Sequence, residues 1–342
     1  MNRYLLISLA CAVLSGAILL MMATPSSEAV RLRNSLIFEV VTESDLRWEP
    51  GQAPSDFRYE PGKPPDSFVR FVSLLPRDVG SNLTGWEFAR AVGQRLTEGG
   101  VRGGAIQGST EQALDRILAD GAGYCADYTQ VVNGLAHAAN VPVREWGMSF
   151  DGFGGNGHAF NEIYDPALAK WVFVDVFYGF FVLDKETEEP LSALEFQDRL
   201  LEGDVASTVR LMAILESGIR FRSDEQALDY YRRGMHQFYL WNGNNVFQFD
   251  RAPLVRAGAV LSRSLEQILG IVNGVQPSIK IPQMAGNKEY LQELHSTRNS
   301  LLAVLTVFVA SSAATLFLII QMLRRRYWIG RSGAGRSVES RG

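Results

Sequence analysis

The chain has 342 residues, of which 46% are hydrophobic, and a formal net charge of −4 at pH 7. This length and apolar content suffice to bury a substantial core, in one large domain or two modest ones. The charge balance argues against a nucleic-acid partner, because the clustered arginines lie mostly in the C-terminal tail, where membrane topology accounts for them.

The N-terminal segment, residues 1–29, is a transmembrane anchor or a signal peptide. Residues 4–22 are uncharged and apolar, and they follow Arg3. This run exceeds the roughly 7–15 residues of a signal-peptide core and approaches the roughly 20 that span a bilayer, which favours a retained anchor. Small residues up to Ala29 leave cleavage open.

Residues 30–83 are predicted to form an extended, Pro-rich arm. They contain an imperfect tandem repeat, Arg47–Phe57 followed by Arg58–Phe68. Five prolines within this repeat disfavour helix, so we expect extended or turn-rich structure that packs its aromatic residues on the body. A Pro-rich partner site is the alternative interpretation.

Helical spacing resumes at Trp86, breaks in a glycine-rich loop, and restarts after a capping pattern that begins at Ser109. The next predicted helix, residues 125–139, begins with Cys125, where backbone N–H groups and the helix dipole favour an anionic sulfur. Cys11 lies in the first apolar run, so the body has no disulfide and its core must hold the fold. A lone thiol outside the cytoplasm indicates a chemical role, although a buried Cys can also act as a small apolar residue.

Two predicted strands follow, residues 158–164 and 171–176. A loop with four glycines, residues 151–157, precedes His158 and is either a movable lid or a hairpin connection. A turn at residues 165–168 would set His158 directly opposite Asp175, close enough for the carboxylate to orient the imidazole. A register shifted by one residue would change the partner and favour Glu162.

A thiol, an imidazole and a carboxylate in this order are the parts of an activated nucleophile. A free thiol, with a pKa near 8.5, needs a neighbouring imidazole or a helix N-terminus to ionise at neutral pH. The other histidines, His137, His236 and His295, show no metal-ligand spacing. The loop at residues 151–157 lacks the ligand spacing of a calcium-binding loop. We therefore predict no metal and no cofactor.

Four segments then carry a family resemblance: Gly123–Tyr128, Val141–Arg144, Gly157–Tyr164 and Trp171–Asp175. In this order they resemble the transglutaminase-like superfamily of papain-related thiol enzymes, over about residues 112–181. The resemblance implies Cys125 as nucleophile, His158 as general base and acid, and Asp175 as its orienting group. It also implies an α+β core, residues 84–190, in which a Cys-bearing helix packs on an antiparallel sheet. Phe160 and Val176 depart from the family's usual Trp and Pro, and neither departure removes a catalytic group.

Residues 191–298 are predicted to be a mostly helical extension, with apolar spacing near 3.6 over 191–201, 205–215, 225–239 and 255–272. Its aromatic residues between His236 and Phe249 are a core cluster or a sugar-stacking surface. Residues 277–282 should end the body, and one helix should run from Lys288 into the membrane. The span, residues 299–323, precedes a basic cytoplasmic tail, residues 324–342, that begins with Arg324–Arg326.

Positive charge at the cytoplasmic end places the body outside, in the periplasm if the membrane is a bacterial inner membrane. The sequence thus predicts a membrane-tethered thiol hydrolase or acyltransferase acting on a peptide or protein amide of the cell envelope. Membrane lipid is the other expected partner. Hydrolysis is the simpler reaction, because water competes with any amine unless the site excludes it. Transglutaminase-type cross-linking and a catalytically inactive binding or assembly role are the alternatives.

Overall fold

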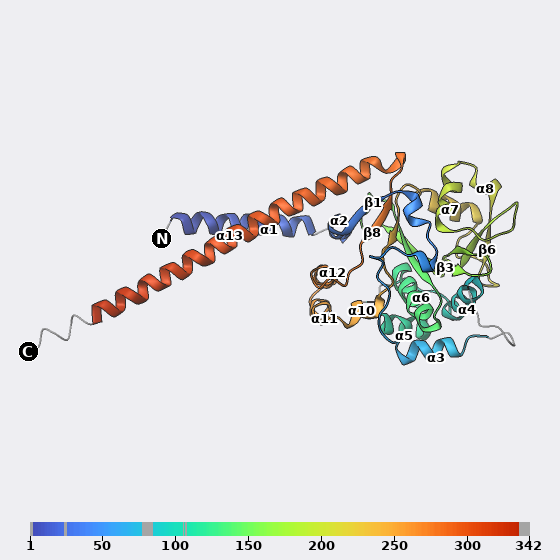
Figure 1. Ribbon diagram of the computed structural model, residues 1–342, viewed down its shortest axis with the longest axis horizontal. Helices are drawn as coiled ribbons and strands as arrows, with labels where there is room; N and C mark the ends of the chain where they lie inside the picture. The colour runs from blue at the N-terminus through green and yellow to red at the C-terminus, as the bar shows by residue number, and fades with distance from the viewer. Residues whose placement is uncertain (1–2, 24–25, 77–84, 105, 107, 335–342) are drawn as a thin grey trace, which may run out of the picture.

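The computed structural model describes residues 3–23, 26–76, 85–104, 106 and 108–334. It has a mixed α+β body, from which two long helices, α1 (Arg3–Ala23) and α13 (Lys288–Ala334), leave on the same side (Figure 1). Residues 77–84, at the end of the predicted arm, and residues 335–342 of the predicted tail lie outside the described residues.

A six-stranded sheet runs through the described part of the body, with strand order β1-β8-β7-β2-β3-β4. Neighbouring strands in this sheet are antiparallel, except β1 and β8, which are parallel. The strands are β1 (Phe38–Val41), β2 (Val143–Ser149), β3 (Gly157–Asp165), β4 (Lys170–Val174), β7 (Phe238–Trp241) and β8 (Ile279–Pro282). A second, two-stranded sheet pairs β5 (Phe180–Asp184) with β6 (Val209–Ala213).

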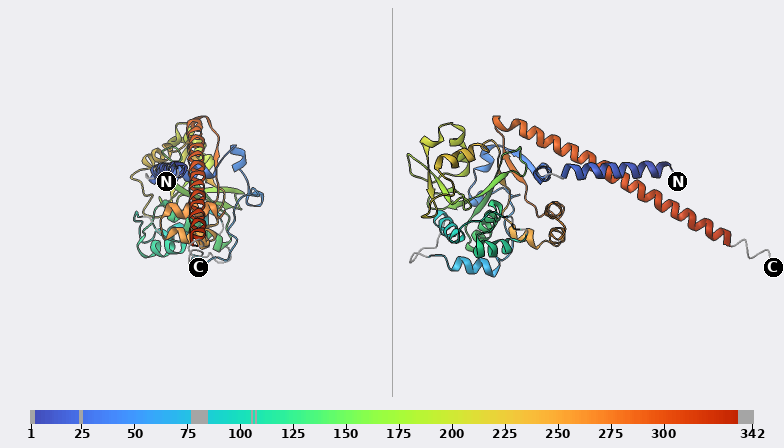
Figure 2. Two further views of the ribbon diagram at one scale, coloured as in Figure 1. Left: turned by 90° about the vertical axis from the view of Figure 1, so that its left-hand side faces the viewer. Right: turned by 180° about the vertical axis from the view of Figure 1, so that it is seen from behind.

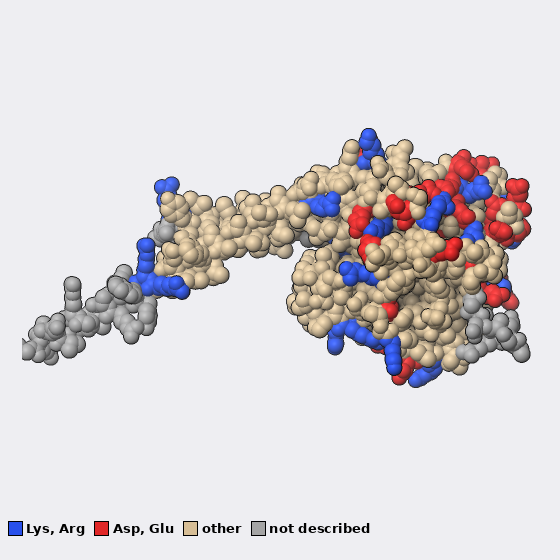
Figure 3. Space-filling model, in the orientation of Figure 1, with Lys and Arg blue, Asp and Glu red and all other residues tan. Residues whose placement is uncertain are grey.

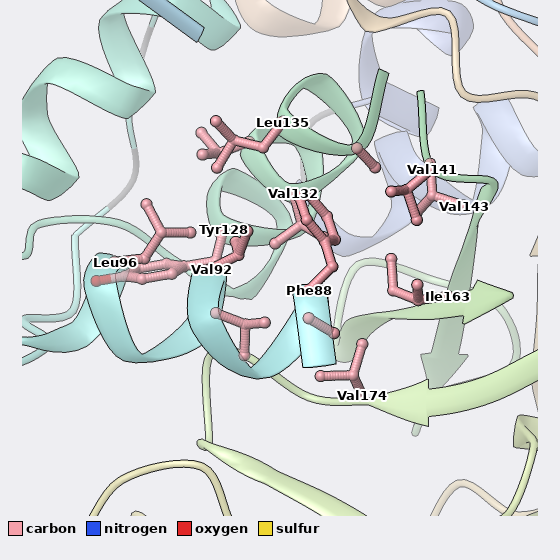
Figure 4. Packing of buried hydrophobic residues seen from close by; sticks show 14 of the residues in the cluster. Phe88, Val92, Leu96, Tyr128, Val132, Leu135, Val141, Val143, Ile163 and Val174 are labelled. Atoms are coloured by element: carbon pink, nitrogen blue, oxygen red, sulfur yellow. The ribbon is translucent and has the colours of Figure 1, made fainter. Parts of the chain in front are cut away.

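Helices α4 (Gly85–Thr97) and α6 (Cys125–Ala139) pack on this sheet, and α5 (Thr110–Asp120) packs on both of them. Figure 4 shows Phe88 of α4 and Val132 of α6 directed toward Ile163 and Val174 of the strands. All four side chains are at most 1% exposed. Burying each contributes roughly 1.5–3 kcal/mol, which fixes α6 and its first residue against the sheet.

A second apolar cluster packs against β2–β4 and includes α7 (Ala193–Leu201), α9 (Asp224–Arg232) and the proline-rich segment. Trp48 and Phe57 of the tandem repeat are buried in this cluster, and Phe68 is buried in the first, so the predicted packing of the arm's aromatics is confirmed for these three, whereas Tyr59 is exposed.

The prediction of an extended arm is wrong for part of the proline-rich segment, which also contains helices. Helix α3 (Asp66–Ser73) begins within its second repeat, directly after Pro65. Proline is tolerated there because the first helical N–H groups have no intrahelical acceptor. Upstream, α2 (Ser26–Ile37) and β1 are regular elements, and two short 3₁₀ turns, Glu43–Leu46 and Pro50–Gln52, follow them.

The prediction of a mostly helical region after residue 190 is wrong in two of its four helical segments, at 209–213 within 205–215 and at the end of 225–239. Strands β7 and β8 belong to the main sheet, and residues 205–215 form the short helix α8 (Val205–Thr208) followed by β6. Short apolar runs do not distinguish a strand from one face of a helix, and pairing within a sheet decides between them. Helices α10 (Val246–Arg251), α11 (Pro253–Ala259) and α12 (Arg263–Val272) follow β7.

Helices α1 and α13 are both long and apolar enough to cross a membrane, with mean hydropathies of 2.5 and 2.4. They pack against each other along their apolar parts. Thr315 Oγ1 donates to Ser8 Oγ across this contact at 2.9 Å. A Cβ atom added to Gly16 would lie 3.2 Å from the Phe308 ring, so the glycine leaves room for this ring between the helices. The prediction that Lys288 starts one continuous helix is confirmed.

Candidate active site

Cys125 is the first residue of α6, as the sequence predicted, and its side chain is half-buried. The helix start is fixed by Asp127, whose carboxylate accepts from the backbone N–H of Tyr124 at 2.8 Å and of Ile106 at 3.2 Å. The preceding helix ends at Gly121, in the left-handed conformation with φ 68° that favours glycine. The sulfur therefore lies at the positive end of a helix.

His158 lies near the start of β3 and is 4% exposed. Its Nε2 lies 2.7 Å from Asp175 Oδ2, and the Cys125 thiol is its other hydrogen-bond partner. Because Nε2 faces the carboxylate, Nδ1 is the ring nitrogen left for the thiol. The structure thus brings together all three side chains singled out in the sequence.

The register that positions His158 and Asp175 differs from the predicted one by two residues. Asp165 pairs with Lys170 and Tyr164 with Trp171, so Asp175, just beyond β4, continues the register opposite Phe160. A shift of two residues keeps a side chain on the same face of the sheet. The pair therefore meets diagonally instead of directly across the strands.

Asp175 is fully buried, and hydrogen bonds hold both of its carboxylate oxygens. Its Oδ1 accepts from the backbone N–H of Tyr178 at 2.9 Å, and its Oδ2 accepts from the hydroxyl of Tyr231 as well as facing His158. Tyr231 lies on α9, far along the chain, and the sequence analysis missed it. Helical spacing places it on a buried face, but nothing in the sequence pairs it with Asp175.

The charges around His158 favour its protonated form. Burial of the ring lowers its pKa, but the Asp175 carboxylate and the Cys125 sulfur outweigh burial and raise the pKa of His158 to about 10. The imidazole is therefore a cation at neutral pH, and a cation next to the sulfur stabilises the thiolate.

Aromatic rings surround the imidazole. The ring centroids of Tyr178, Tyr230 and Phe177 lie 4.9, 5.7 and 6.1 Å from that of His158. Burial raises the pKa of the Tyr178 and Tyr230 hydroxyls, which hydrogen-bond to each other. These rings limit the access of water to His158, which strengthens its interaction with Asp175.

The glycine-rich loop before His158 is attached to helix α2. Asn34 Nδ2 donates to the backbone carbonyl of Phe153 at 2.7 Å, and Ser27 Oγ donates to Asp151 Oδ2 at 2.5 Å. Ser27 Oγ also accepts from the backbone N–H of Gly155 at 2.9 Å. Phe153 itself is fully buried. These contacts favour a fixed hairpin connection over a movable lid.

Glu162, the alternative partner for His158, serves a different role. Its Oε2 accepts from Arg144 Nη2 and Trp146 Nε1, each at 2.5 Å, and its Oε1 accepts from the backbone N–H of Ala193 at 2.7 Å. Both charged side chains are almost completely buried. The glutamate thus neutralises a buried arginine and does not contact the imidazole.

The other histidines are separate from this site. His137 Nε2 lies 2.7 Å from the carbonyl oxygen of Gly62, and His295 stacks edge-on against Phe38. Across the described residues, no group of three or more His, Cys, Asp or Glu side chains is arranged to hold a metal ion.

Fold and site together define a mixed α+β domain in which a cysteine at a helix start meets a buried histidine–aspartate pair. Residues 78–176 match the family model of the transglutaminase-like superfamily. This part of the chain is therefore a transglutaminase-like superfamily domain, and it includes Cys125, His158 and Asp175. No curated protein matches the chain. Tyr231, β7 and β8 lie outside the matched residues.

Proposed function

We propose that the protein is a membrane-tethered, extracytoplasmic cysteine hydrolase or acyltransferase that acts on an amide. The observation that carries the proposal is the hydrogen-bonded series Cys125–His158–Asp175 at the start of α6. A thiol enzyme needs these three groups in this order of contact.

In the proposed reaction the Cys125 thiolate attacks the carbonyl carbon of the amide. The C–N bond then breaks, and His158 gives its proton to the departing amine, leaving a thioester on the sulfur. Neutral His158 next takes a proton from water, which attacks the thioester and releases the acid and the thiolate. Asp175 holds the ring in place and stabilises the imidazolium.

The negative oxygen that forms during attack needs hydrogen-bond donors. The first N–H groups of a helix have no intrahelical acceptor, so the backbone N–H of Cys125 is a suitable donor at the attacked carbonyl. We propose it as one half of an oxyanion hole.

Hydrolysis and acyl transfer share every step up to the thioester. They differ only in whether water or an amine attacks it, so transglutaminase-type cross-linking is the second candidate. An inactive binding or assembly protein is the third, and the contacts of His158 favour an enzyme over it. A binding role would not require a buried imidazolium paired with a carboxylate next to a thiol.

Membrane tethering is supported by the two apolar helices, which pack on each other and leave the body together. Arg3 is the first residue of α1, and Arg324 and Arg325 lie near the end of α13, so each helix carries positive charge at one of its ends. The positive-inside rule then places the body outside the cytoplasm, the periplasm in the case of a bacterial inner membrane. Helix α2 also supports a retained anchor, since cleavage after Ala29 would remove Ser27 from the loop before His158.

The test is the pH dependence of iodoacetamide alkylation in the full-length protein, with Cys11→Ser so that only Cys125 reacts. The ratio of the rate at pH 6 to the rate at pH 9 should fall at least fivefold in His158→Ala, because the stabilising cation is lost. His137→Ala, a histidine later on the same helix, is the matched control and should leave the ratio unchanged. Equal ratios in all three proteins would contradict the proposed site.

The reaction itself is tested by supplying a mixed peptide pool with and without a primary amine. Release of free amine or ammonia that disappears in Cys125→Ser supports an enzyme, and incorporation of the added amine identifies acyl transfer. A reactive, His158-dependent Cys125 that produces neither would favour the binding role.

A further inference from the structure

Helices α11 and α12 form a hairpin on the side of the body from which α1 and α13 leave (Figures 1 and 2). We propose that this hairpin is a membrane-docking surface whose apolar tip enters the outer leaflet of the bilayer crossed by α1 and α13. The inference rests on the proposed membrane tethering, and it assigns the bilayer a second contact with the protein beyond the two spans.

The hairpin carries a dense set of exposed apolar side chains. Val260 and Leu261, at the turn between the helices, are 86% and 76% exposed, and Val272 is 71% exposed. Leu254 and Ile268 are also exposed, so five large apolar side chains lie within one short segment. Elsewhere on the described body such residues are exposed in ones and twos, which is usual for a protein surface.

The hairpin is a packed unit. A Cβ atom added to Gly258 would lie 2.9 Å from the backbone of Glu266, so the two helices are in close contact. Ser262 caps α12 by accepting from the backbone N–H of Leu265 at 3.2 Å. Val255 of α11 is buried in a small apolar cluster. The exposed apolar residues therefore lie on the outer side of the hairpin.

The position of the hairpin identifies what covers it. Helix α12 packs on α2, which directly follows α1 in the chain. The hairpin therefore lies at the level where α1 leaves the body, and this is where a bilayer crossed by α1 begins (Figure 2). A bilayer at that level meets the tip without any movement of the body.

The charge distribution fits a membrane as well. Between residues 253 and 274 the sequence has one acidic residue, Glu266, and it is buried. Arg256 is exposed on α11, where it can meet lipid headgroups. On the face seen in Figure 3, acidic side chains gather at the end of the body away from the spans. This combination is typical of helices that lie in the membrane interface.

The experiment uses the full chain with Cys11→Ser and Cys125→Ser, carrying one added cysteine labelled with an environment-sensitive fluorophore and reconstituted into liposomes. Leu261→Cys places the label at the tip. Leu74→Cys, 70% exposed directly after α3, is the matched control for a solvated leucine, and Leu316→Cys, 59% exposed on α13, reports the span. Quenching is compared between nitroxide-labelled lipid and aqueous iodide.

We expect lipid nitroxide to quench the label at position 261 at least threefold more than the label at position 74, and iodide to quench it correspondingly less. If position 261 behaves like position 74 while position 316 is quenched by lipid, docking is wrong and tethering stands. If position 261 is shielded from both quenchers, a protein covers the tip and docking is again wrong. If position 316 is not quenched by lipid, tethering itself fails, and docking with it.

A second variant guards against a label that itself drives insertion. Val260→Asp, at an exposed position, should leave the fold intact and lower the lipid quenching of a label at Val272→Cys at least twofold. If Val260→Asp leaves the lipid quenching of the label at position 272 unchanged, the proposal is wrong.

Discussion

The hydroxyl of Tyr231 donates to Asp175 Oδ2, the same oxygen that lies 2.7 Å from His158 Nε2. A residue of α9, outside the matched family segment, thereby holds the carboxylate that orients the imidazole. Tyr231 is a positioning residue in this arrangement, because it acts on Asp175 and does not reach the sulfur.

Tyr231→Phe should lower the free energy of unfolding by about 1.5–3 kcal/mol, the usual contribution of a hydrogen bond to a charged group. It should also raise the pKa of His158, since the carboxylate no longer shares its charge with the hydroxyl. Denaturant unfolding measures the first effect and histidine NMR the second. Tyr59→Phe, an exposed tyrosine, is the control and should change neither. A loss of stability without a change in the pKa of His158 would show that Tyr231 has only a structural role.

Asp175→Asn should move the pKa of His158 downward, from about 10 toward or below the ordinary value of 6.5. The substitution removes the largest influence that raises this pKa and leaves the burial that lowers it. NMR titration of labelled histidine is practical because the chain has four histidines. A His158 pKa that stays near its wild-type value in the variant would show that Asp175 does not hold the cation.

The same pKa predicts how stability depends on pH. Because the folded-state pKa of His158 lies above the unfolded value, the ion pair stabilises the fold fully below about pH 6.5. That contribution should decline as pH rises from there through about 10. Melting temperatures measured between pH 6 and 10.5 should therefore fall less in Asp175→Asn than in the wild-type protein. Parallel curves would contradict this linkage.

Glu162→Gln should destabilise the protein by about 3–5 kcal/mol, because it leaves the Arg144 guanidinium buried without a counter-charge. Burial lowers the pKa of Arg144, and Glu162 opposes that effect. Glu195→Gln is the matched control: its pair with Lys170 is partly solvated, so about 0–1 kcal/mol is expected. Chemical denaturation compares the two variants. An equal loss of stability in both variants would show that the buried pair of Arg144 and Glu162 contributes no more than the partly solvated pair.

Ser27→Ala should loosen the loop that precedes His158. The hydroxyl of Ser27 bonds both Asp151 and Gly155, so its removal breaks two contacts between α2 and this loop. Amide hydrogen exchange over residues 151–157 should accelerate several-fold in the variant. Ser73→Ala, which removes a hydroxyl bonded only within its own helix, should not affect this loop. Unchanged exchange in Ser27→Ala would mean that the remaining contacts of α2 suffice.

The sequence predicted the local parts of this site and missed the distant ones. Cys125 at a helix start follows from the glycines before it, and His158 with Asp175 follows from two short strands in sequence order. The register was wrong by two residues because the turn at residues 166–169 had to be guessed, yet an even shift preserved the pairing. Tyr231 could not be found in this way, since its contact with Asp175 depends on how α9 packs.

The larger error concerned the residues after position 190. Phe238–Trp241 and Val209–Ala213 form strands, although the apolar spacing of the segments that contain them fits one face of a helix. Their strand conformation is decided by partners elsewhere in the chain, β2 for the first and β5 for the second. Periodicity in a single segment contains no information about such partners.

The parallel pairing of β1 with β8 joins the segment that follows one membrane helix to the segment that precedes the other. In the proposed topology the body is thus a closed loop of chain with both ends in the bilayer. A protease that cuts one connector leaves the domain attached through the other, and the paired strands keep the cut ends together. Release of the domain into the surrounding medium would require two separate cuts.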